Sequence, residues 1–246
     1  MQFQFKYVPG IPFFLAMLTA MSLLSSVPAY AVGVAMLSDI NVNGGGSGVC
    51  SSTSDGRQAF GKIGSQYFFC GKDLEHGAEL WVTDGNAAGT HLVKDIIAGT
   101  ESSQPEYLIV MGGQVFFTTG RGEELWKSDG TTAGTQLVKS FAQMSTNSPI
   151  RALVSFGGKL YFSGDDGVNG RELWVSDGTA AGTVLFKDIQ AGSGSGSRPG
   201  AFTVIGATMF FSADDGVNGR ELWKTDGTPG GTLMIKDILS GTGGSE

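Results

Sequence analysis

The chain is poor in the residues that most catalytic and nucleic-acid-binding sites require. Its 246 residues include two histidines, His76 and His91, and two cysteines. Histidine-based metal sites and general bases are therefore poorly supplied. Charged residues make up 16% of the chain, the formal net charge is −7, and there is no basic run. We do not expect a nucleic acid partner, because binding a phosphate backbone requires a face of lysine and arginine.

Familiar catalytic motifs are also missing. The sequence contains no G-x-S-x-G, H-E-x-x-H or C-x-x-C motif and no phosphate-binding loop. The glycine-rich stretches 44–46 and 192–196 lack the strand–loop–helix context of a nucleotide site, so we interpret them as loops. These absences predict a protein that is not an enzyme.

Glycine, by contrast, is abundant, with 40 residues. Glycine in a helix interior costs about 1 kcal/mol relative to alanine, which argues against a helical protein. Apolar residues still make up 41% of the chain, enough surface to bury, so disorder is not expected. The glycines show no three-residue period, which excludes collagen. The composition predicts a compact chain of short strands and tight turns.

The first 31 residues have the pattern of an export signal. Lys6 precedes an apolar stretch at 11–24, and Ala29-Tyr30-Ala31 has the small-x-small pattern of a cleavage site. We expect cleavage after Ala31 and a secreted or cell-surface protein. The alternative is an uncleaved anchor, since residues 32–37 are also mostly apolar.

A seven-residue motif, Glu-Leu-Trp-x-(Ser/Thr)-Asp-Gly, occurs four times, and each copy is followed by a Gly-Thr pair. The motif contains all the tryptophans of the chain, Trp81, Trp126, Trp174 and Trp223. In the third unit, apolar runs at 152–156, 159–163, 172–176 and 184–189 are separated by turn residues. A four-stranded antiparallel meander that is repeated in tandem is typical of the blades of a propeller.

The predicted fold class is therefore all-β, with β-propeller-like tandem repeats forming four blades of four short antiparallel strands. The repeat domain is placed at residues 32–246, with units at about 37–96, 97–141, 142–189 and 190–238.

The pattern of the fourth strand occurs a fifth time, at residues 36–40. Either this copy is a spare strand that caps an edge, or the chain is part of a longer array. We favour the array, whose open strand edges would promote self-association.

The repeated motif with its downstream Gly-Thr resembles the ELWxxDGT repeat of bacterial secreted and surface proteins, over residues 37–246. The resemblance implies a propeller-like domain in an exported protein and no particular reaction. The first unit departs from the pattern, with Asn86 where the others have threonine.

The repeated aromatic and acidic side chains each admit a structural and a functional interpretation. We expect the tryptophans to pack between neighbouring units, the alternative being a ligand-stacking surface. The motif aspartates are predicted to accept backbone N–H bonds in Asx-type turns, the alternative being metal ligands. These aspartates are Asp84, Asp129, Asp177 and Asp226. The motif glutamates are predicted to be solvated or to form ion pairs that link units, and they are Glu79, Glu124, Glu172 and Glu221.

Two acidic turns, 165–170 and 214–219, are the best candidates for ligand binding. Their oxygen donors suit Ca²⁺. The candidate ligands are Asp165, Asp166, Asn169, Asp214, Asp215 and Asn218. The match to a calcium loop is partial, because Gly167 and Gly216 stand where an oxygen ligand is needed. Turn formation alone is the alternative, and we favour it.

Cys50 and Cys70 are predicted to form a disulfide, as two cysteines of an exported chain commonly do. It would tie the irregular start of the first unit to its second strand. The alternative is two free thiols.

The function predicted from these features is a non-enzymatic exported repeat module for binding or for assembly at the cell surface or in the matrix. Its partner would be a protein or a glycan. The alternatives are a calcium-dependent adhesion or matrix protein and a propeller hydrolase acting on polysaccharide.

Overall fold

The structure is a computed structural model that describes residues 50, 60–120, 122–141, 150–192 and 196–241. All of these residues belong to one compact unit, Leu37–Glu246. The predicted export signal and the fifth copy of the fourth-strand pattern lie outside the described residues. No helix in the described part is long and apolar enough to cross a membrane.

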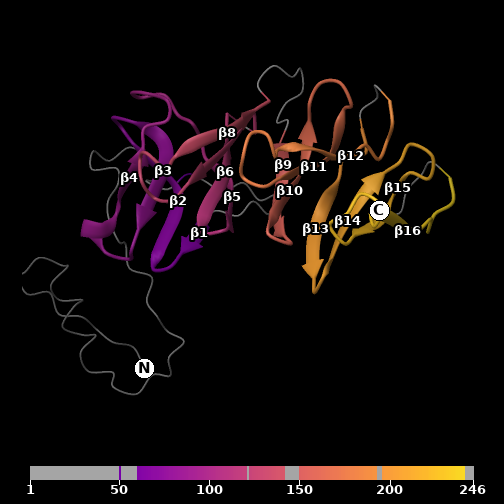
Figure 1. Ribbon diagram of the computed structural model, residues 1–246. Coiled ribbons are helices and arrows are strands. Elements are labelled where there is room, and N and C mark those ends of the chain that lie inside the picture. The colour runs from indigo at the N-terminus through magenta and orange to yellow at the C-terminus, as the bar shows by residue number, and fades with distance from the viewer. Residues whose placement is uncertain (1–49, 51–59, 121, 142–149, 193–195, 242–246) are drawn as a thin grey trace, which may run out of the picture. The chain divides into compact units, whose positions relative to one another are not determined.

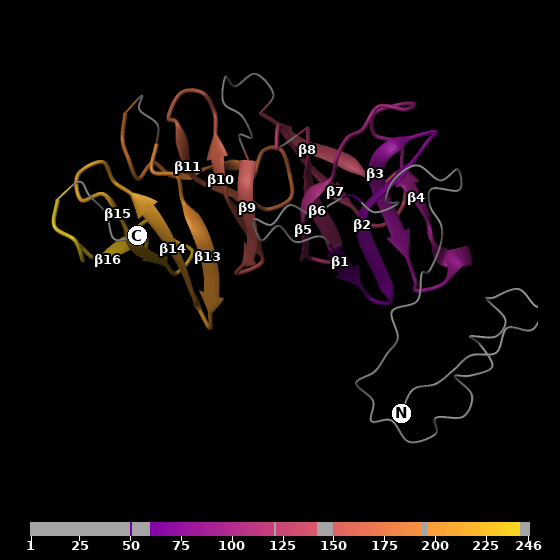
Figure 2. The ribbon, with the colours of Figure 1, turned by 180° about the vertical axis from the view of Figure 1, so that it is seen from behind.

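The described strands form four antiparallel sheets of four strands each, which follow one another in chain order (Figures 1 and 2). Sheet A contains β1 (Phe60–Ile63), β2 (Gln66–Asp73), β3 (Gly77–Thr83) and β4 (His91–Lys94), with a short 3-10 helix, η2 (Ala87–Gly89), between the last two. Sheet B contains β5 (Glu106–Met111), β6 (Gln114–Thr119), β7 (Glu124–Ser128) and β8 (Gln136–Ser140). Sheet C contains β9 (Ile150–Phe156), β10 (Lys159–Asp165), β11 (Arg171–Ser176) and β12 (Val184–Lys187). Sheet D contains β13 (Gly200–Ile205), β14 (Thr208–Asp214), β15 (Arg220–Thr225) and β16 (Leu233–Lys236).

The all-β class and the four-stranded meander of each unit are therefore confirmed. Each sheet lies within one of the predicted units, and in sheet C the four predicted apolar runs correspond to β9–β12. Strand β9 begins two residues before its predicted start, and β12 ends at Lys187, two residues before its predicted end. No described sheet closes on itself, and the predicted propeller arrangement is not confirmed.

Tight glycine turns join the first two strands of sheets B and C. Gly157 and Gly158 link β9 to β10 with φ of 58° and 74°. Gly112 and Gly113 link β5 to β6 with φ of 59° and 77°. Two successive residues with positive φ define the turn whose twist suits a two-residue hairpin, and glycine adopts them without strain.

Consecutive sheets pack face to face through three apolar clusters. One joins sheets A and B, one joins B and C, and one joins C and D. Neighbouring side chains of a strand point to opposite faces. In β6, for example, Phe117 lies in the cluster with sheet A, whereas Phe116 lies in the cluster with sheet C. The first strands also contact in succession, β1 with β5, β5 with β9 and β9 with β13.

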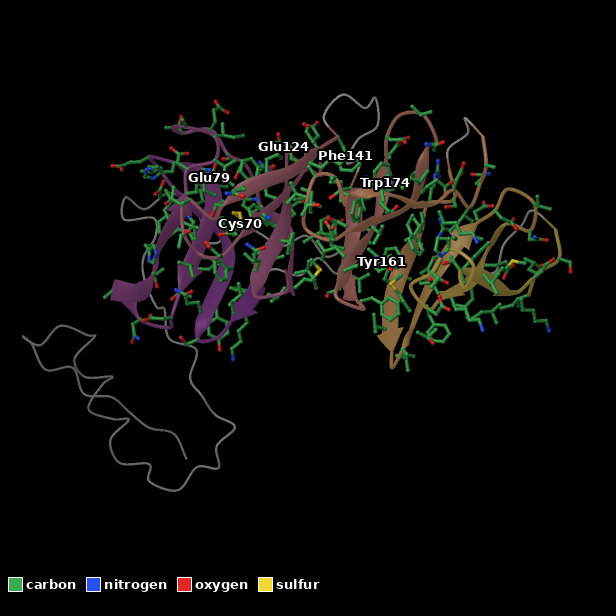
Figure 3. The ribbon with its side chains drawn as sticks, in the orientation of Figure 1. Cys70, Glu79, Glu124, Phe141, Tyr161 and Trp174 are labelled. Atoms are coloured by element: carbon green, nitrogen blue, oxygen red, sulfur yellow. A yellow bond between two sulfur atoms is a disulfide. The ribbon has the colours of Figure 1, made fainter. Side chains whose placement is uncertain are left out.

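Three of the four tryptophans pack against the preceding sheet. Trp126, Trp174 and Trp223 lie in the clusters that join sheets B, C and D to the sheet before each. The ring of Trp174 meets Phe141 edge to face with 5.1 Å between ring centroids (Figure 3). Trp81 belongs to the first described sheet and is only partly buried.

Replacing Trp174 with alanine should destabilise the protein more than the same change at Trp81. Trp174 is 5% exposed between two sheets, and truncating such a core aromatic costs about 3–5 kcal/mol. Trp81 lies on a face with no described sheet in front of it, so its truncation should cost less than half as much. Thermal unfolding at low protein concentration measures both variants, and equal losses would contradict packing between sheets.

Candidate functional site

The aspartate of each motif closes the turn between the third and fourth strands. In sheet C, Asp177 Oδ1 accepts hydrogen bonds from Thr179 N at 2.8 Å and Thr179 Oγ1 at 2.7 Å. The same pair of bonds forms at Asp129 and Asp226. In sheet A, where the divergent Asn86 replaces the threonine, Asp84 Oδ1 accepts a hydrogen bond from Asn86 N at 2.9 Å. These bonds are those of Asx-type turns.

The downstream Gly-Thr pair completes this turn. A Cβ on Gly182 would overlap the carboxylate of Asp177, which is why the position needs glycine. Thr183 Oγ1 donates to Thr179 O at 2.6 Å and lies 2.7 Å from Ser176 Oγ. Ser176 Oγ in turn accepts from the N–H of Gly178 at 3.0 Å. The fixed spacing between the motif and its Gly-Thr pair therefore reflects one closed network of hydrogen bonds.

The motif glutamate of sheet C is buried and holds the segment that leads to sheet D. Glu172 Oε2 accepts from Ser197 Oγ at 2.5 Å and from Ile189 N at 2.8 Å. Its Oε1 accepts from Ser197 N at 2.7 Å and from Gln190 N at 3.2 Å. One carboxylate thus fixes both ends of the segment that connects β12 to β13.

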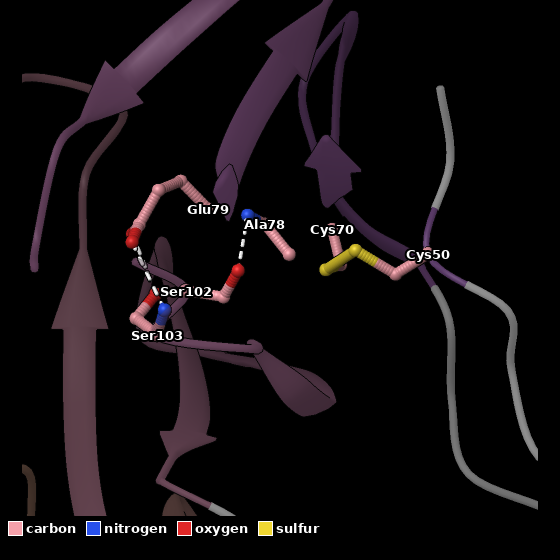
Figure 4. Close-up of a disulfide and its surroundings, with 6 residues drawn as sticks. All are labelled: Cys50, Cys70, Ala78, Glu79, Ser102 and Ser103. Carbon is pink, nitrogen blue, oxygen red and sulfur yellow. Dashed lines mark hydrogen bonds between the residues drawn. A yellow bond between two sulfur atoms is a disulfide. The ribbon is translucent and has the colours of Figure 1, made fainter. Parts of the chain in front are cut away.

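In sheet A, the motif glutamate binds the segment that leads to sheet B in the same way. Glu79 accepts from the N–H of Ser103 at 3.0 Å and from its hydroxyl at 2.5 Å (Figure 4). It also accepts from Ile96 N at 3.2 Å. Beside it, Ser102 Oγ accepts from Ala78 N at 2.9 Å. In sheet D, Glu221 is 1% exposed and accepts from the N–H that follows the last strand, at Leu239.

Sheet B departs from this arrangement because its turn between β6 and β7 is shorter. Glu124 accepts from Thr119 Oγ1 and from Trp126 Nε1, both at 2.8 Å. The connecting segment is bound by backbone carbonyls instead. Phe141 N donates to Glu123 O at 2.6 Å, and Ile150 N donates to the carbonyl of residue 122 at 2.9 Å. The shortened turn therefore replaces carboxylate acceptors with main-chain ones.

The expectation that the motif glutamates are solvated is wrong for Glu79, Glu172 and Glu221, which are at most 1% exposed. The carboxylates of Glu79 and Glu172 do link consecutive sheets, but through hydrogen bonds rather than the expected ion pairs. They do so through N–H and hydroxyl donors of the connecting segment. An acid can be buried there because these donors replace the water that it loses.

Burial raises the pKa of Glu79 and Glu172 above the ordinary value of 4.5, and the hydrogen bonds from Ser103 and Ser197 offset part of this increase. A raised pKa in the folded state means that the fold favours the neutral acid. The corresponding stability is complete below the ordinary pKa and is lost as the pH rises through the raised value.

The acidic turns hold their own backbone. Asp166 Oδ1 accepts from the N–H groups of Val168 at 2.9 Å and Asn169 at 2.8 Å, and its Oδ2 accepts from Asn169 Nδ2 at 2.8 Å. Asp165 Oδ1 accepts from Gly167 N at 2.8 Å. The second turn repeats these bonds at Asp214, Asp215 and Asn218. Within the described residues, no group of three or more His, Cys, Asp or Glu side chains is placed to hold a metal ion.

The predicted disulfide between Cys50 and Cys70 is present (Figure 4). Cys70 lies on β2, and Cys50 N also donates to Cys70 O at 3.0 Å. The bridge therefore ties the chain before sheet A to the second strand of that sheet.

The serines that contact the glutamates were missed by the sequence interpretation. Ser103 and Ser197 are fully buried, and each begins a Ser-x-Pro sequence after the motif glutamate. The residues between, Gln104 and Arg198, have φ of 51° and 48°. The recurrence of Ser-x-Pro at nearly the same distance from the motif was the signal that could have identified this contact.

Replacing Glu172 with alanine should destabilise the protein without touching an apolar cluster. Four donors lose their acceptor, and each unsatisfied buried donor costs about 1–3 kcal/mol. We expect a loss of at least about 3 kcal/mol, which lowers the melting temperature by roughly 6 °C or more.

Glu75→Ala is the matched control, since Glu75 is exposed and its loss should cost less than about 0.5 kcal/mol. Glu172→Gln keeps one acceptor oxygen and should fall between the two. Equal melting temperatures for Glu172→Ala and the control would show that the carboxylate does not hold the connecting segment.

No family model and no curated protein matches this chain. Among solved structures, the chain is similar to the computationally designed Ika8 protein, with a TM-score of 0.44, 16% identity and coverage of 75% of this chain and 50% of Ika8. Its similarity to puromycin hydrolase has a TM-score of 0.46 and 18% identity, and covers 77% of this chain and 28% of the hydrolase. Its similarity to BamB from Moraxella catarrhalis has a TM-score of 0.36 and 15% identity, and covers 66% of this chain and 43% of BamB. The chain thus spans half or less of the length of these three proteins, and such scores give no information on activity.

Proposed function

We propose that the protein is a non-enzymatic exported repeat module that binds a protein or glycan, or assembles, at the cell surface or in the matrix. The observation that carries this proposal is the structural use of the acids of the repeat. Glu172 is enclosed by donors of the connecting segment, and Asp177 is engaged in its turn. An acid–base catalyst needs a carboxyl group that can reach a substrate. Glu172 is fully buried, and the exposed Asp177 has its Oδ1 engaged by Thr179.

Export is supported by two features. The disulfide between Cys50 and Cys70 is of a kind that forms and persists in oxidising compartments. The N-terminal sequence has the apolar stretch and small-x-small site of a cleaved signal. The motif resemblance to ELWxxDGT proteins is in keeping with both.

The proposed architecture is a β-propeller or a partial propeller array. Four-stranded meanders that pack face to face, with contacts between successive first strands, support it. Calcium is not part of the proposal, because both carboxylate oxygens of Asp166 already accept hydrogen bonds from the turn itself.

The test is a paired screen of the exported, processed protein for glycan binding and for polysaccharide hydrolysis. We expect binding to a restricted set of glycans or surface proteins and no release of reducing sugar. The variants Glu172→Gln and Asp177→Asn, checked for folding by circular dichroism, serve as controls. Hydrolysis that is lost in a folded variant would overturn the proposal in favour of a propeller hydrolase.

A further inference from the structure

The face of sheet D that points away from sheet C exposes apolar positions that the other sheets bury. Leu222 is 41% exposed, whereas its counterparts Leu80, Leu125 and Leu173 are fully buried. The same holds for Ile235, Ile238 and Ile205, which are 45%, 62% and 64% exposed. Their counterparts in sheets A, B and C all lie in or against the apolar cluster with the next sheet. Among the described residues, no sheet packs on this face of sheet D.

The face of sheet A that points away from sheet B is the opposite half of such a contact. Tyr67 is 39% exposed, although the corresponding residues Val115, Leu160 and Met209 are fully buried against the preceding sheet. Phe60 is 54% exposed, whereas its counterpart Leu108 is 1% exposed. Exposed apolar patches of this kind mark interaction sites.

The two faces match in shape at an aromatic side chain and a glycine. At each internal contact, the glycine of the Asp-Gly turn lies against an aromatic ring of the preceding sheet. Gly130 lies against Phe68, Gly178 against Phe116, and Gly227 against Phe156 and Tyr161. In sheet A, the corresponding Gly85 has no atom within 4 Å of its Cβ position. In sheet D, Phe210 occupies the strand position of Phe68 and Phe116.

The two faces also match in hydrogen bonding. A lysine near the end of the fourth strand of sheets A, B and C donates to a threonine carbonyl of the next sheet. These bonds join Lys94 to Thr135 at 2.9 Å, Lys139 to Thr183 at 2.9 Å, and Lys187 to Thr232 at 2.6 Å. In sheet D the same position is held by Lys236, which is exposed, and in sheet A the matching acceptor position is Thr90.

We infer that the outer face of sheet D binds the outer face of sheet A in a second copy of this chain, in the arrangement of the three internal contacts. Each of the exposed features has a counterpart that makes contact between consecutive sheets, so the proposed contact continues the three internal ones. Within the described residues, no apolar cluster joins sheet D to sheet A of the same chain.

Such a contact uses two different surfaces, so copies join head to tail. It differs from pairing through open strand edges, because here side-chain faces meet. The inference rests on the proposed assembly function and names its partner.

The test is sedimentation velocity of the processed protein over a range of concentrations, with one variant for each face. Ile235→Asp places a charge in the face of sheet D, and Tyr67→Asp places one in the face of sheet A. Each should weaken self-association by more than about tenfold. Val217→Asp is the matched control, because Val217 is 69% exposed on a turn outside both faces, and it should associate like the unchanged protein.

Mixing the two face variants gives the decisive result, with circular dichroism confirming that both are folded. A head-to-tail contact predicts that the mixture forms dimers, since one variant keeps an intact face of sheet A and the other an intact face of sheet D. An unchanged protein that is monomeric at all concentrations, a face variant that associates alone as tightly as the unchanged protein, or a mixture that associates no better than either variant alone would each overturn the inference. Glycan or protein binding by a strictly monomeric protein would leave the proposed function standing while ending this inference.

Discussion

Each sheet of this protein carries apolar side chains on both faces, so a sheet is complete only between two others. Sheets B and C meet this condition. In sheet B, Phe117 packs toward sheet A and Phe116 toward sheet C, and in sheet C, Phe162 packs toward sheet B and Tyr161 toward sheet D. The repeat therefore does not specify a self-sufficient unit. It specifies the contact between one sheet and the next, and the arrangement of the sheets follows from repeating that contact.

The glutamate of the motif fixes the position of one sheet relative to the next, which apolar packing alone does not do. Two flat apolar faces could slide over one another, but Glu79 and Glu172 bind the segments that lead to the next sheet and so limit where that sheet can lie. A half-satisfied carboxylate at this depth would be costly, and the donors of Ser103 and Ser197 reduce that cost. Sheet B shows that the constraint matters more than the residue, because main-chain carbonyls bind its connecting segment.

The sequence was sufficient for the fold class because the relevant information is local and repeated. Turn glycines, alternating apolar residues and a tryptophan at the position of Trp174 recur in every unit, and the strands of the third unit could be placed within two residues. The Asx turn at Asp177 was accessible for the same reason, since its donors lie two residues away. The environment of Glu172 could not be predicted in the same way. Its partner Ser197 lies 25 residues further along the chain, and only the folded connecting segment brings the two together. An acid in a repeated motif also looks solvated until its donors are known, which explains the incorrect expectation.

Hydrogen–deuterium exchange on the processed protein tests most directly whether the sheets depend on neighbours at both faces. In dilute solution, we expect stronger amide protection in sheets B and C than in sheets A and D, whose outer faces meet no other described sheet. On concentration, sheets A and D should gain protection together while sheets B and C change little. Uniform protection across the four sheets that does not vary with concentration would contradict this dependence.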